Sequence, residues 1–197
     1  MARIFSPESV IEVAASLKND VQSLIKLYSS LSPIISNEHA AIKNHNLVAI
    51  EDAQKTKLDI GQQIELTFEA LKEKYSNLAG WHDNFFQNDQ KQKPPSLSLC
   101  IEYLKQLKEK FPSTGLSTQV LDHQIKAIDE LFIKLQKVMS EVKPAIETNK
   151  LVLQKMAFNY QESYRFWMEL DAEFTASYNA QGLQKSSENN SILRVKA

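Results

Sequence analysis

Four histidines and one cysteine are the residues of this chain whose chemistry could support metal binding or catalysis. A di-iron site in a helical bundle needs Glu three residues before His, so that both ligands lie on one helix face. None of the histidines, which are His39, His45, His82 and His123, has Glu at that position. Cys100 lies between two aliphatic residues, which is typical of a small buried apolar residue rather than a nucleophile. We therefore expect no metal site, no cofactor and no enzymatic activity.

Phosphotransfer is the other chemical function that a helical chain with few histidines could perform. A phosphotransfer bundle carries an exposed His on a helix, commonly followed by Lys-Gly at the third and fourth positions. His39 is followed instead by Ala-Ala-Ile-Lys, with no Gly, which favours a partly buried residue at the edge of an apolar stripe. The sequence also lacks the glycine patterns of nucleotide sites and the G-x-S-x-G motif of hydrolases.

The composition favours helices and gives no sign of a nucleic-acid or lipid surface. Only four Gly and six Pro occur in 197 residues, too few for the frequent turns of a sheet protein. The 23 basic and 24 acidic residues are mixed along the chain and give a net charge of -1. Met1-Ala2-Arg3 is not followed by a signal-peptide pattern, and no run approaches the ~18 apolar residues of a membrane span. We expect a cytoplasmic protein that neither binds nucleic acid nor inserts into membranes.

The first helix is predicted to begin at Ser6-Pro7-Glu8, which matches an N-cap, a proline at the first helical position and a carboxylate favoured by the helix dipole. Apolar residues then recur at steps of three and four, which places them on one stripe facing a partner helix. They are Val10, Ala14, Leu17, Val21, Leu24, Tyr28, Leu31, Ile35 and Ile42. We expect Pro33 to kink this helix.

The break Asn44-His45-Asn46 is short enough to force an antiparallel return, and Asn46 can cap the next helix. A hairpin is therefore predicted from residues 6–45 and 46–79, with Gly80 ending its second helix. The stripe of this second helix consists of Leu47, Ile50, Ala53, Ile60, Ile64, Phe68, Leu71, Tyr75 and Leu78.

Residues 80–116 are predicted to form a loop as far as the Pro-Pro pair before Ser96 and then a short helix from about Leu97 to Lys110. A third apolar stripe begins at Leu121 and runs through the aromatic residues near the C-terminus, which predicts a long helix over 117–180, kinked near Pro144. Pro144 could instead split this region into two helices. The expected fold is all-α: an elongated antiparallel bundle of long, coiled-coil-like helices in a single domain over 1–183. We expect the tail, 184–197, to be disordered.

The end of the long helix is unusually rich in aromatic side chains. On a helical wheel, Tyr160, Tyr164, Trp167, Phe174 and Tyr178 continue the apolar stripe, and periodicity favours a core position for them. Leu151, Phe158 and Phe166 lie near the opposite side, with Leu170 between the two groups. A helix that is apolar on two sides must be buried on both or keep one for a partner. We expect Leu151, Phe158, Phe166 and Leu170 to bind a partner helix, with Tyr160, Tyr164 and Trp167 as supporting contacts or rearranging core. Phe174 and Tyr178 complete the predicted substrate-binding set.

Two polar residues, Glu38 and Asn149, occupy stripe positions where Leu or Ile is usual. A polar residue in such a seam commonly fixes the register of the packed helices at some cost in stability. Contact with a partner protein is the alternative interpretation.

The region from 34 to 65 has a recurring pattern formed by Glu38, Ala41, Ile42, Asn46, Leu47, Ile50, Ala53, Lys57, Ile60 and Ile64. This pattern resembles the N-terminal half of the FlgN family of flagellar type III export chaperones. Gly61 departs from the Leu that is usual there, and Asn46 replaces the usual Asp. The C-terminal half is also similar, with Asn149 and Leu153 opening a helix that ends in Tyr178-Asn-Ala-Gln-Gly182. The two patterns cover about half of the chain and leave residues 80–115 unmatched.

The resemblance implies a cytoplasmic chaperone that binds the C-terminal helical segments of hook-filament junction proteins, prevents their premature assembly and delivers them to the export apparatus. It places substrate binding in the C-terminal region, which contains the aromatic stretch. Components of the export gate or of the ATPase complex, and a second copy of the chain, are further candidate partners. The alternative function is that of a structural coiled-coil or adaptor protein that self-associates through the same aromatic stripe.

Overall fold

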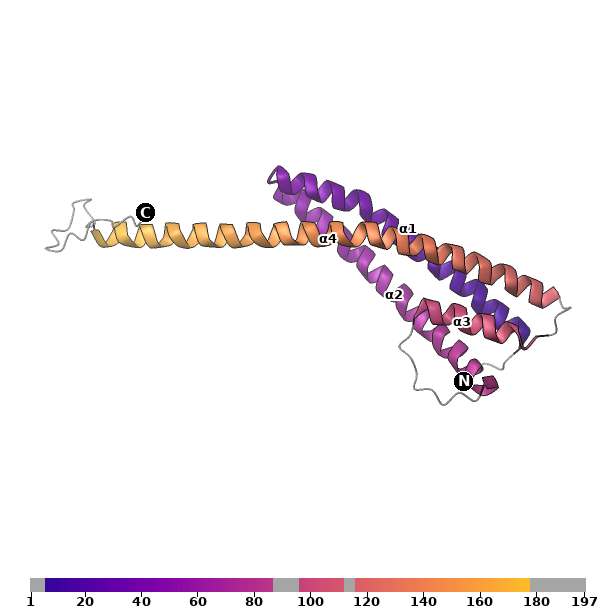
Figure 1. Cartoon of the computed structure of the whole chain (residues 1–197). Coiled ribbons are helices and arrows are strands. Elements are labelled where there is room, and N and C mark those ends of the chain that lie inside the picture. The colour runs from indigo at the N-terminus through magenta and orange to yellow at the C-terminus, as the bar shows by residue number, and fades with distance from the viewer. Residues whose placement is uncertain (1–5, 87–95, 112–115, 178–197) are drawn as a thin grey trace. The chain divides into compact units, whose positions relative to one another are not determined.

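The computed structural model describes residues 6–86, 96–111 and 116–177, and within these ranges the chain forms four α-helices and no strand. The helices are α1 (Pro7–Lys43), α2 (Leu47–Phe86), α3 (Leu97–Lys108) and α4 (Leu116–Ser177), as Figure 1 shows. The prediction of an all-α helical bundle is confirmed. The predicted tail, 184–197, lies outside the described residues.

The start of α1 is set by local hydrogen bonds, as predicted. The hydroxyl of Ser6 accepts from the backbone N–H of Ser9 at 3.1 Å, and the backbone N–H of Ser6 donates to the Ser9 hydroxyl at 2.9 Å. This reciprocal pair satisfies donors that the first helical turn leaves without an intrahelical partner. All the apolar stripe residues predicted for this helix are buried. α1 continues through Pro33 without interruption.

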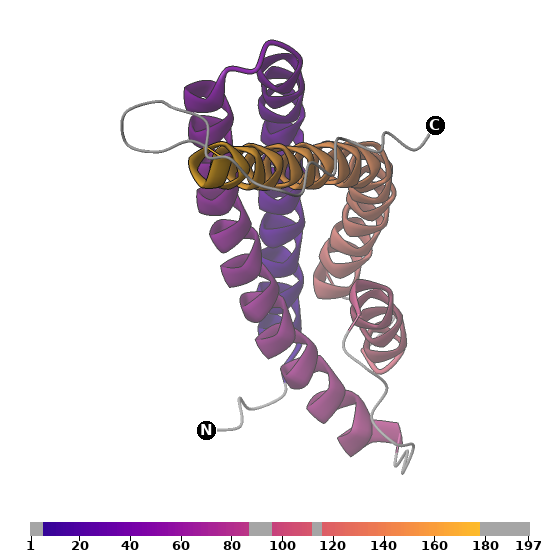
Figure 2. The same ribbon diagram turned by 90° about the vertical axis from the view of Figure 1, so that its left-hand side faces the viewer.

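The turn between α1 and α2 also forms where the sequence predicts it. His45 has a φ of 52°, a left-handed conformation that lets the chain reverse within three residues. The side-chain oxygen of Asn46 then accepts from the backbone N–H of Ala49 at 3.1 Å and caps α2. α1 and α2 consequently lie side by side as an antiparallel pair, which Figures 1 and 2 show from two directions.

A second antiparallel pair is formed by α3 and the first part of α4. Lys105 pairs with Asp129, and Lys108 pairs with Asp122, each with 2.7 Å between nitrogen and oxygen. The two pairs share one core to which all four helices contribute, with Leu17 and Leu24 of α1, Leu78 of α2, Leu104 and Leu107 of α3, and Leu121 and Ile128 of α4 among its fully buried members.

The predicted end of α2 is wrong. The helix does not end at Gly80 but continues to Phe86. Glycine costs about 1 kcal/mol relative to alanine inside a helix, and the burial of Leu78, Ala79 and Trp81 around it outweighs that penalty. The stripe is also incomplete, because Leu47 is 68% exposed and Phe68 is 38% exposed. Leu47 is the first residue of the helix, and Phe68 lies where cover by a further helix is only partial.

The chain divides into two compact units, one ending at Asn149 and the other beginning at Lys150. α4 contributes to both and is one uninterrupted helix through Pro144, so the long helix is a single element. A kink near Pro144 and a single domain over 1–183 stay predictions.

Replacing Gly80 with alanine separates the predicted helix end from the observed helix interior. A Cβ at Gly80 meets no atom within 4 Å. Gly80→Ala should therefore raise the free energy of unfolding by about 0.5–1 kcal/mol, which corresponds to roughly 1–4 °C in melting temperature. Gly61→Ala, at the other open helical glycine, is the matched comparison. Thermal unfolding followed by circular dichroism measures both, and destabilisation by Gly80→Ala alone would contradict a helical Gly80.

Candidate functional site

The aromatic segment of α4 lies in the second unit, where it is exposed to solvent. Tyr160 is 58% exposed and Trp167 is 64% exposed, so the two largest stripe residues have most of their surface in water. The other large residues with more than half of their surface exposed are Leu151, Phe158, Tyr164, Phe166 and Met168. Leu170 is half-buried. The side chain of Phe174 and all of Tyr178 lie outside the described residues.

The prediction that the stripe aromatics form core is wrong for Tyr160, Tyr164 and Trp167. α4 is the only element described in the second unit, so the unit itself supplies no helix to cover them. Helical periodicity correctly placed these residues on one face, but it does not tell whether the covering helix belongs to the same chain. The exposed set therefore includes Tyr160, Tyr164 and Trp167, which were predicted as supporting contacts or rearranging core, as well as Leu151, Phe158 and Phe166.

Two rows of residues, each repeating every seven positions, make up the apolar face of α4. We call them the inner row, which is Leu121, Ile128, Leu135, Val142 and Asn149, and the outer row, which is Ile125, Phe132, Met139 and Ile146. Beyond Asn149 the outer row continues with Leu153, Tyr160 and Trp167, and the inner row continues with Met156, Ser163 and Leu170. The spacing is that of a coiled coil, so the exposed segment has the pattern of a helix that packs lengthwise against another.

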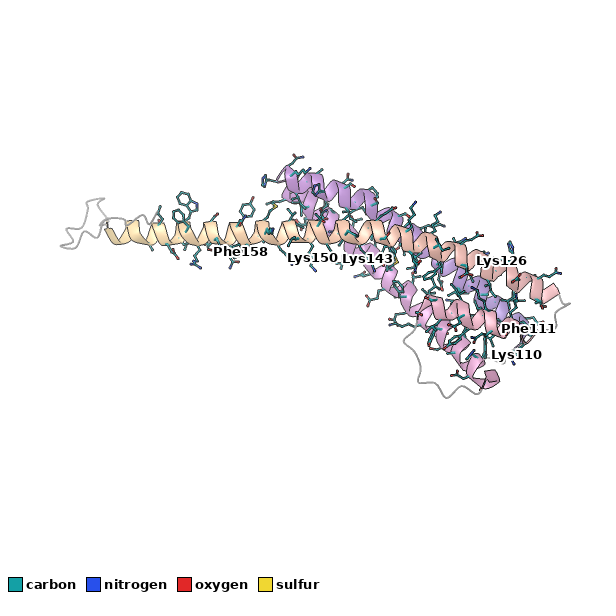
Figure 3. The ribbon with its side chains drawn as sticks, viewed as in Figure 1. Lys110, Phe111, Lys126, Lys143, Lys150 and Phe158 are labelled. Atoms are coloured by element: carbon teal, nitrogen blue, oxygen red, sulfur yellow. The ribbon has the colours of Figure 1, made fainter. Side chains whose placement is uncertain are left out.

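The side of α4 opposite these rows is charged. Arg165 lies 3.2 Å from Glu169 and 3.8 Å from Glu162, in two ion pairs along the helix. Phe158 lies seven residues before Arg165 and shares this side, as does Leu151 a further seven residues earlier. Figure 3 shows the side chain of Phe158 on the exposed helix. The predicted site residues are therefore spread around α4. Leu151 and Phe158 lie on its charged side, farthest from the seven-residue rows.

Met168 is a large exposed residue that the sequence analysis missed as a site residue. It is 53% exposed and comes directly after Trp167, four residues beyond Tyr164. The i, i+4 spacing from Tyr164 was a signal that could have identified it. Phe166 and Trp167 meet edge to face, with ring centroids 5.8 Å apart, which orders two of the largest exposed rings.

The two polar residues of the seams, Glu38 and Asn149, contact each other at the end of the first unit. The Asn149 amide nitrogen donates to Glu38 Oε2 and to the backbone oxygen of Ile35, each at 2.9 Å. Glu38 Oε1 accepts from Lys57 Nζ at 2.6 Å and from the amide of Gln54. Both Glu38 and Asn149 are buried, and these hydrogen bonds offset the cost of removing their polar groups from water.

This polar cluster joins α1, α2 and α4 at one level of the bundle. His39, which is partly buried as predicted, lies with its Nδ1 3.0 Å from the Asn149 side-chain oxygen. Sliding α4 by one helical turn would separate Asn149 from its partners and leave Glu38 short of a donor. The arrangement favours the interpretation that Glu38 and Asn149 fix helix register over the alternative of a partner contact.

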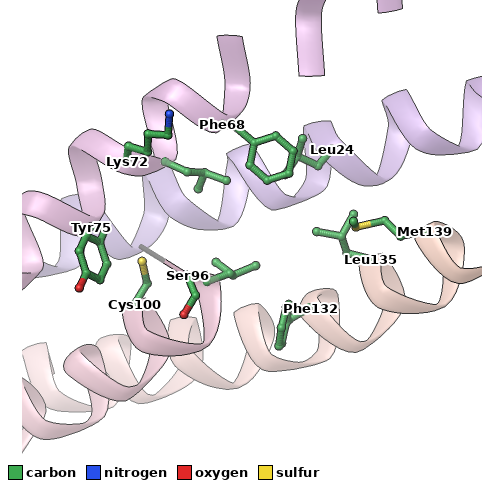
Figure 4. A pocket seen from close by; sticks show the side chains of 11 residues that line it. Leu24, Phe68, Lys72, Tyr75, Ser96, Cys100, Phe132, Leu135 and Met139 are labelled. Carbon is green, nitrogen blue, oxygen red and sulfur yellow. The ribbon is translucent and has the colours of Figure 1, made fainter. Parts of the chain in front are cut away.

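A cavity of about 350 Å³ lies between the four helices of the first unit, as Figure 4 shows. Leu24, Phe68, Leu71, Tyr75, Leu97, Phe132, Leu135 and Met139 give it an apolar wall, and Lys72, Ser96 and Cys100 complete it. Cys100 is buried as predicted, and this burial raises the pKa of its thiol to about 11. At neutral pH almost all of the thiol is protonated, so Cys100 has little nucleophilic character.

Two other kinds of site, a metal centre and a membrane span, are absent from the described residues. No group of three or more His, Cys, Asp or Glu side chains in that part of the chain could hold a metal ion. None of the four described helices combines the length and the apolar character that crossing a bilayer requires. Comparison of the chain with protein-family models, with curated proteins and with solved structures finds no match.

Asn149→Leu should lower the free energy of unfolding by roughly 1–3 kcal/mol, because it leaves the buried Glu38 Oε2 without a donor. Denaturant unfolding measures this change. In a Glu38→Leu background the same substitution should cost much less, since no buried carboxylate then lacks a partner and Lys57 can reach water. Equal costs in the two backgrounds would show that the two side chains are not coupled.

Proposed function

We propose that this protein is a chaperone that captures amphipathic helices, and that its cargo is the C-terminal helical segment of hook-filament junction proteins of the bacterial flagellum. In this proposal the chain binds the cargo before assembly, covers the surface through which it would otherwise associate, and delivers it to the type III export apparatus. The resemblance to FlgN-like chaperones in residues 34–65 and 149–182 suggests the cargo. The chemistry of binding is that of the exposed face of α4.

The observation that carries the proposal is the exposure of large apolar side chains on the part of α4 that continues its seven-residue repeat. Leu153, Tyr160 and Trp167 continue an outer row whose earlier members pack against the core of the first unit. Soluble proteins seldom leave a contiguous apolar patch of this kind uncovered unless it serves an interaction. A helix that presents such a stripe is complementary to another amphipathic helix, which is the form in which the proposed cargo ends are expected to bind.

The composition of the face suits reversible binding. Full burial of one large apolar side chain is worth roughly 1.5–3 kcal/mol, and Tyr160 and Trp167 each have more than half of their surface available. Tyrosine and tryptophan also lose little conformational entropy when they are buried, which makes them effective anchors. Part of this gain offsets the ordering of the cargo helix, so affinity in the micromolar range is expected and the cargo can be released.

Calorimetric titration of the full chain with peptides from the C-terminal ends of the same organism's hook-filament junction proteins tests the proposal. We expect one-to-one binding at micromolar or lower dissociation constants. Tyr160→Ser/Trp167→Ser should weaken this binding at least tenfold, because it removes two aromatic anchors of the outer row. Leu151→Ser/Phe158→Ser, which alters two residues on the charged side, should weaken it less.

Circular dichroism of both variants serves as the control for helix content. Absence of binding to every such peptide, with the helices intact, would refute the proposed cargo. If the two variants lost peptide affinity equally, the peptide would contact all sides of α4 rather than the apolar stripe alone. The self-associating adaptor, as the alternative function, predicts no peptide binding and a dimer at all concentrations.

A further inference from the structure

α3 covers only one end of the bundle, and the apolar stripe of α2 changes character where α3 begins. α3 has 12 residues and starts at Leu97, where the Ser96 hydroxyl caps it by accepting from the Leu99 N–H at 3.2 Å. Along α3, the α2 residues Leu71, Tyr75 and Leu78 are buried. Further along the same stripe, Ile60 and Ile64 are only half-buried and Phe68 is exposed. α3 therefore covers the apolar stripe of α2 at one end of the bundle, and no described helix covers it in the same way at the other end.

α4 shows the same change on the row that faces α3. Its inner row, which ends at Asn149 beside Ile35 and Glu38 of α1, is buried from Leu121 onward. Its outer row is buried at Ile125, beside α3, and is half-buried at Phe132, where α3 begins, and at Met139 and Ile146 beyond it. We call the surface formed by Ile60, Ile64 and Phe68 of α2 together with Phe132, Met139 and Ile146 of α4 the open seam.

The cavity marks the place where the open seam begins. Ser96 at the start of α3 lines it together with Phe68 of α2 and with Phe132 and Met139 of α4, as Figure 4 shows. Leu97 also lines it. A side chain from an added helix that continued the line of α3 would enter the cavity at this point. The surface thus continues an interface that already exists between α3 and its two neighbours.

The exposed segment of α4 is long enough to cover the open seam. The far end of the open seam is set by the polar cluster, where Lys57 of α2 and Asn149 of α4 both reach Glu38. From Ile60 to Phe68 a helix rises about 12 Å, and from Phe132 to Ile146 about 21 Å, at 1.5 Å per residue. The exposed apolar segment of α4, from Leu151 to Leu170, extends about 29 Å by the same measure. One helix of that length would cover the whole open seam.

Charges along the edge of α4 indicate the net charge of a helix that could pack on the open seam. Asp122 and Asp129, seven residues apart, pair with lysines of α3. The same edge continues with Gln136 and then Lys143, which is exposed and is labelled in Figure 3. Lys72 lines the cavity on the α2 side, where its ion pair with Glu69 is solvent-exposed and so contributes little. The edge therefore changes from acidic beside α3 to basic beside the open seam, which favours an acidic helix.

We propose that the open seam binds the aromatic segment of α4, residues 151–177, from a second copy of this chain. That segment is a helix with an uncovered apolar stripe, and its charged residues are Glu162, Glu169, Asp171 and Glu173 against Lys155 and Arg165. It is accordingly acidic, as the edge of the open seam requires. α4 is uninterrupted from Leu116 to Ser177, so this segment can lie against another part of α4 only in a second molecule. The pairing does not depend on the identity of any cargo.

Sedimentation velocity and tryptophan fluorescence of the full chain test this pairing in a Trp81→Phe background, in which Trp167 is the only tryptophan. With rising protein concentration we expect a dimer to form, and the emission of Trp167 to shift to shorter wavelength over the same range as the ring leaves water. Phe68→Glu and Lys143→Glu should each weaken dimerisation at least tenfold, because they place a carboxylate opposite the acidic segment.

Lys134→Glu is the matched control, since it makes the same charge change at an exposed position of α4 outside the seven-residue rows. It should leave the dimerisation constant unchanged. A monomer at every concentration overturns the proposal. So does a dimer that is insensitive to both Phe68→Glu and Lys143→Glu, which would show that two aromatic segments pair with each other instead. Lys143→Glu lies on the surface, so its result holds even if Phe68→Glu impairs folding. Failure of the cargo titration would leave this result unaffected.

Discussion

A single geometric constraint underlies the structure: α4 has 62 residues and carries an apolar stripe from Leu121 to Leu170, whereas α1 has 37 residues and α2 has 40. Helices of those lengths cannot cover the whole stripe. The first unit buries the inner row from Leu121 to Val142 and ends the packed region with the polar pair of Glu38 and Asn149. Beyond that pair, the same helix presents tyrosine, tryptophan and methionine side chains to water. Aromatic and methionine side chains are suited to contacts that form and break, which aliphatic core residues serve less well.

Features controlled by neighbouring residues could be predicted from the sequence. Ser6 caps α1 and Asn46 caps α2 because each side chain reaches a backbone N–H three residues away. The stripe of α1 was also correct, since a period of 3.5 residues directly reports which side of a helix is buried. The helix end at Gly80 was predicted wrongly because glycine's low helix propensity can be read from the sequence alone. The burial of its neighbours, which keeps the helix going, depends on packing against other helices.

The candidate site could be predicted only in part, because periodicity identifies an apolar face without identifying what covers it. Tyr160 and Trp167 obey the same spacing as Phe132 and Met139, although the first two are exposed and the second two are partly packed. Glu38 and Asn149 were recognisable as polar residues in apolar stripes, and register control was among the interpretations. Their direct contact was not predictable, since 111 positions separate them in the sequence and only the packed bundle brings them together.

The continuity of α4 across Asn149 also has a consequence for how its outer segment folds. An isolated helix of this length would be marginal in water, because the first turn must be ordered before any hydrogen bond is gained. In this chain that nucleation cost does not arise beyond Asn149, since the preceding turns are already held by Glu38 and Ile35. The aromatic segment can therefore lengthen and shorten one residue at a time from a fixed base. Binding of a partner would then change only how many residues beyond Asn149 are helical. The position at which this helical segment starts is already fixed by the first unit.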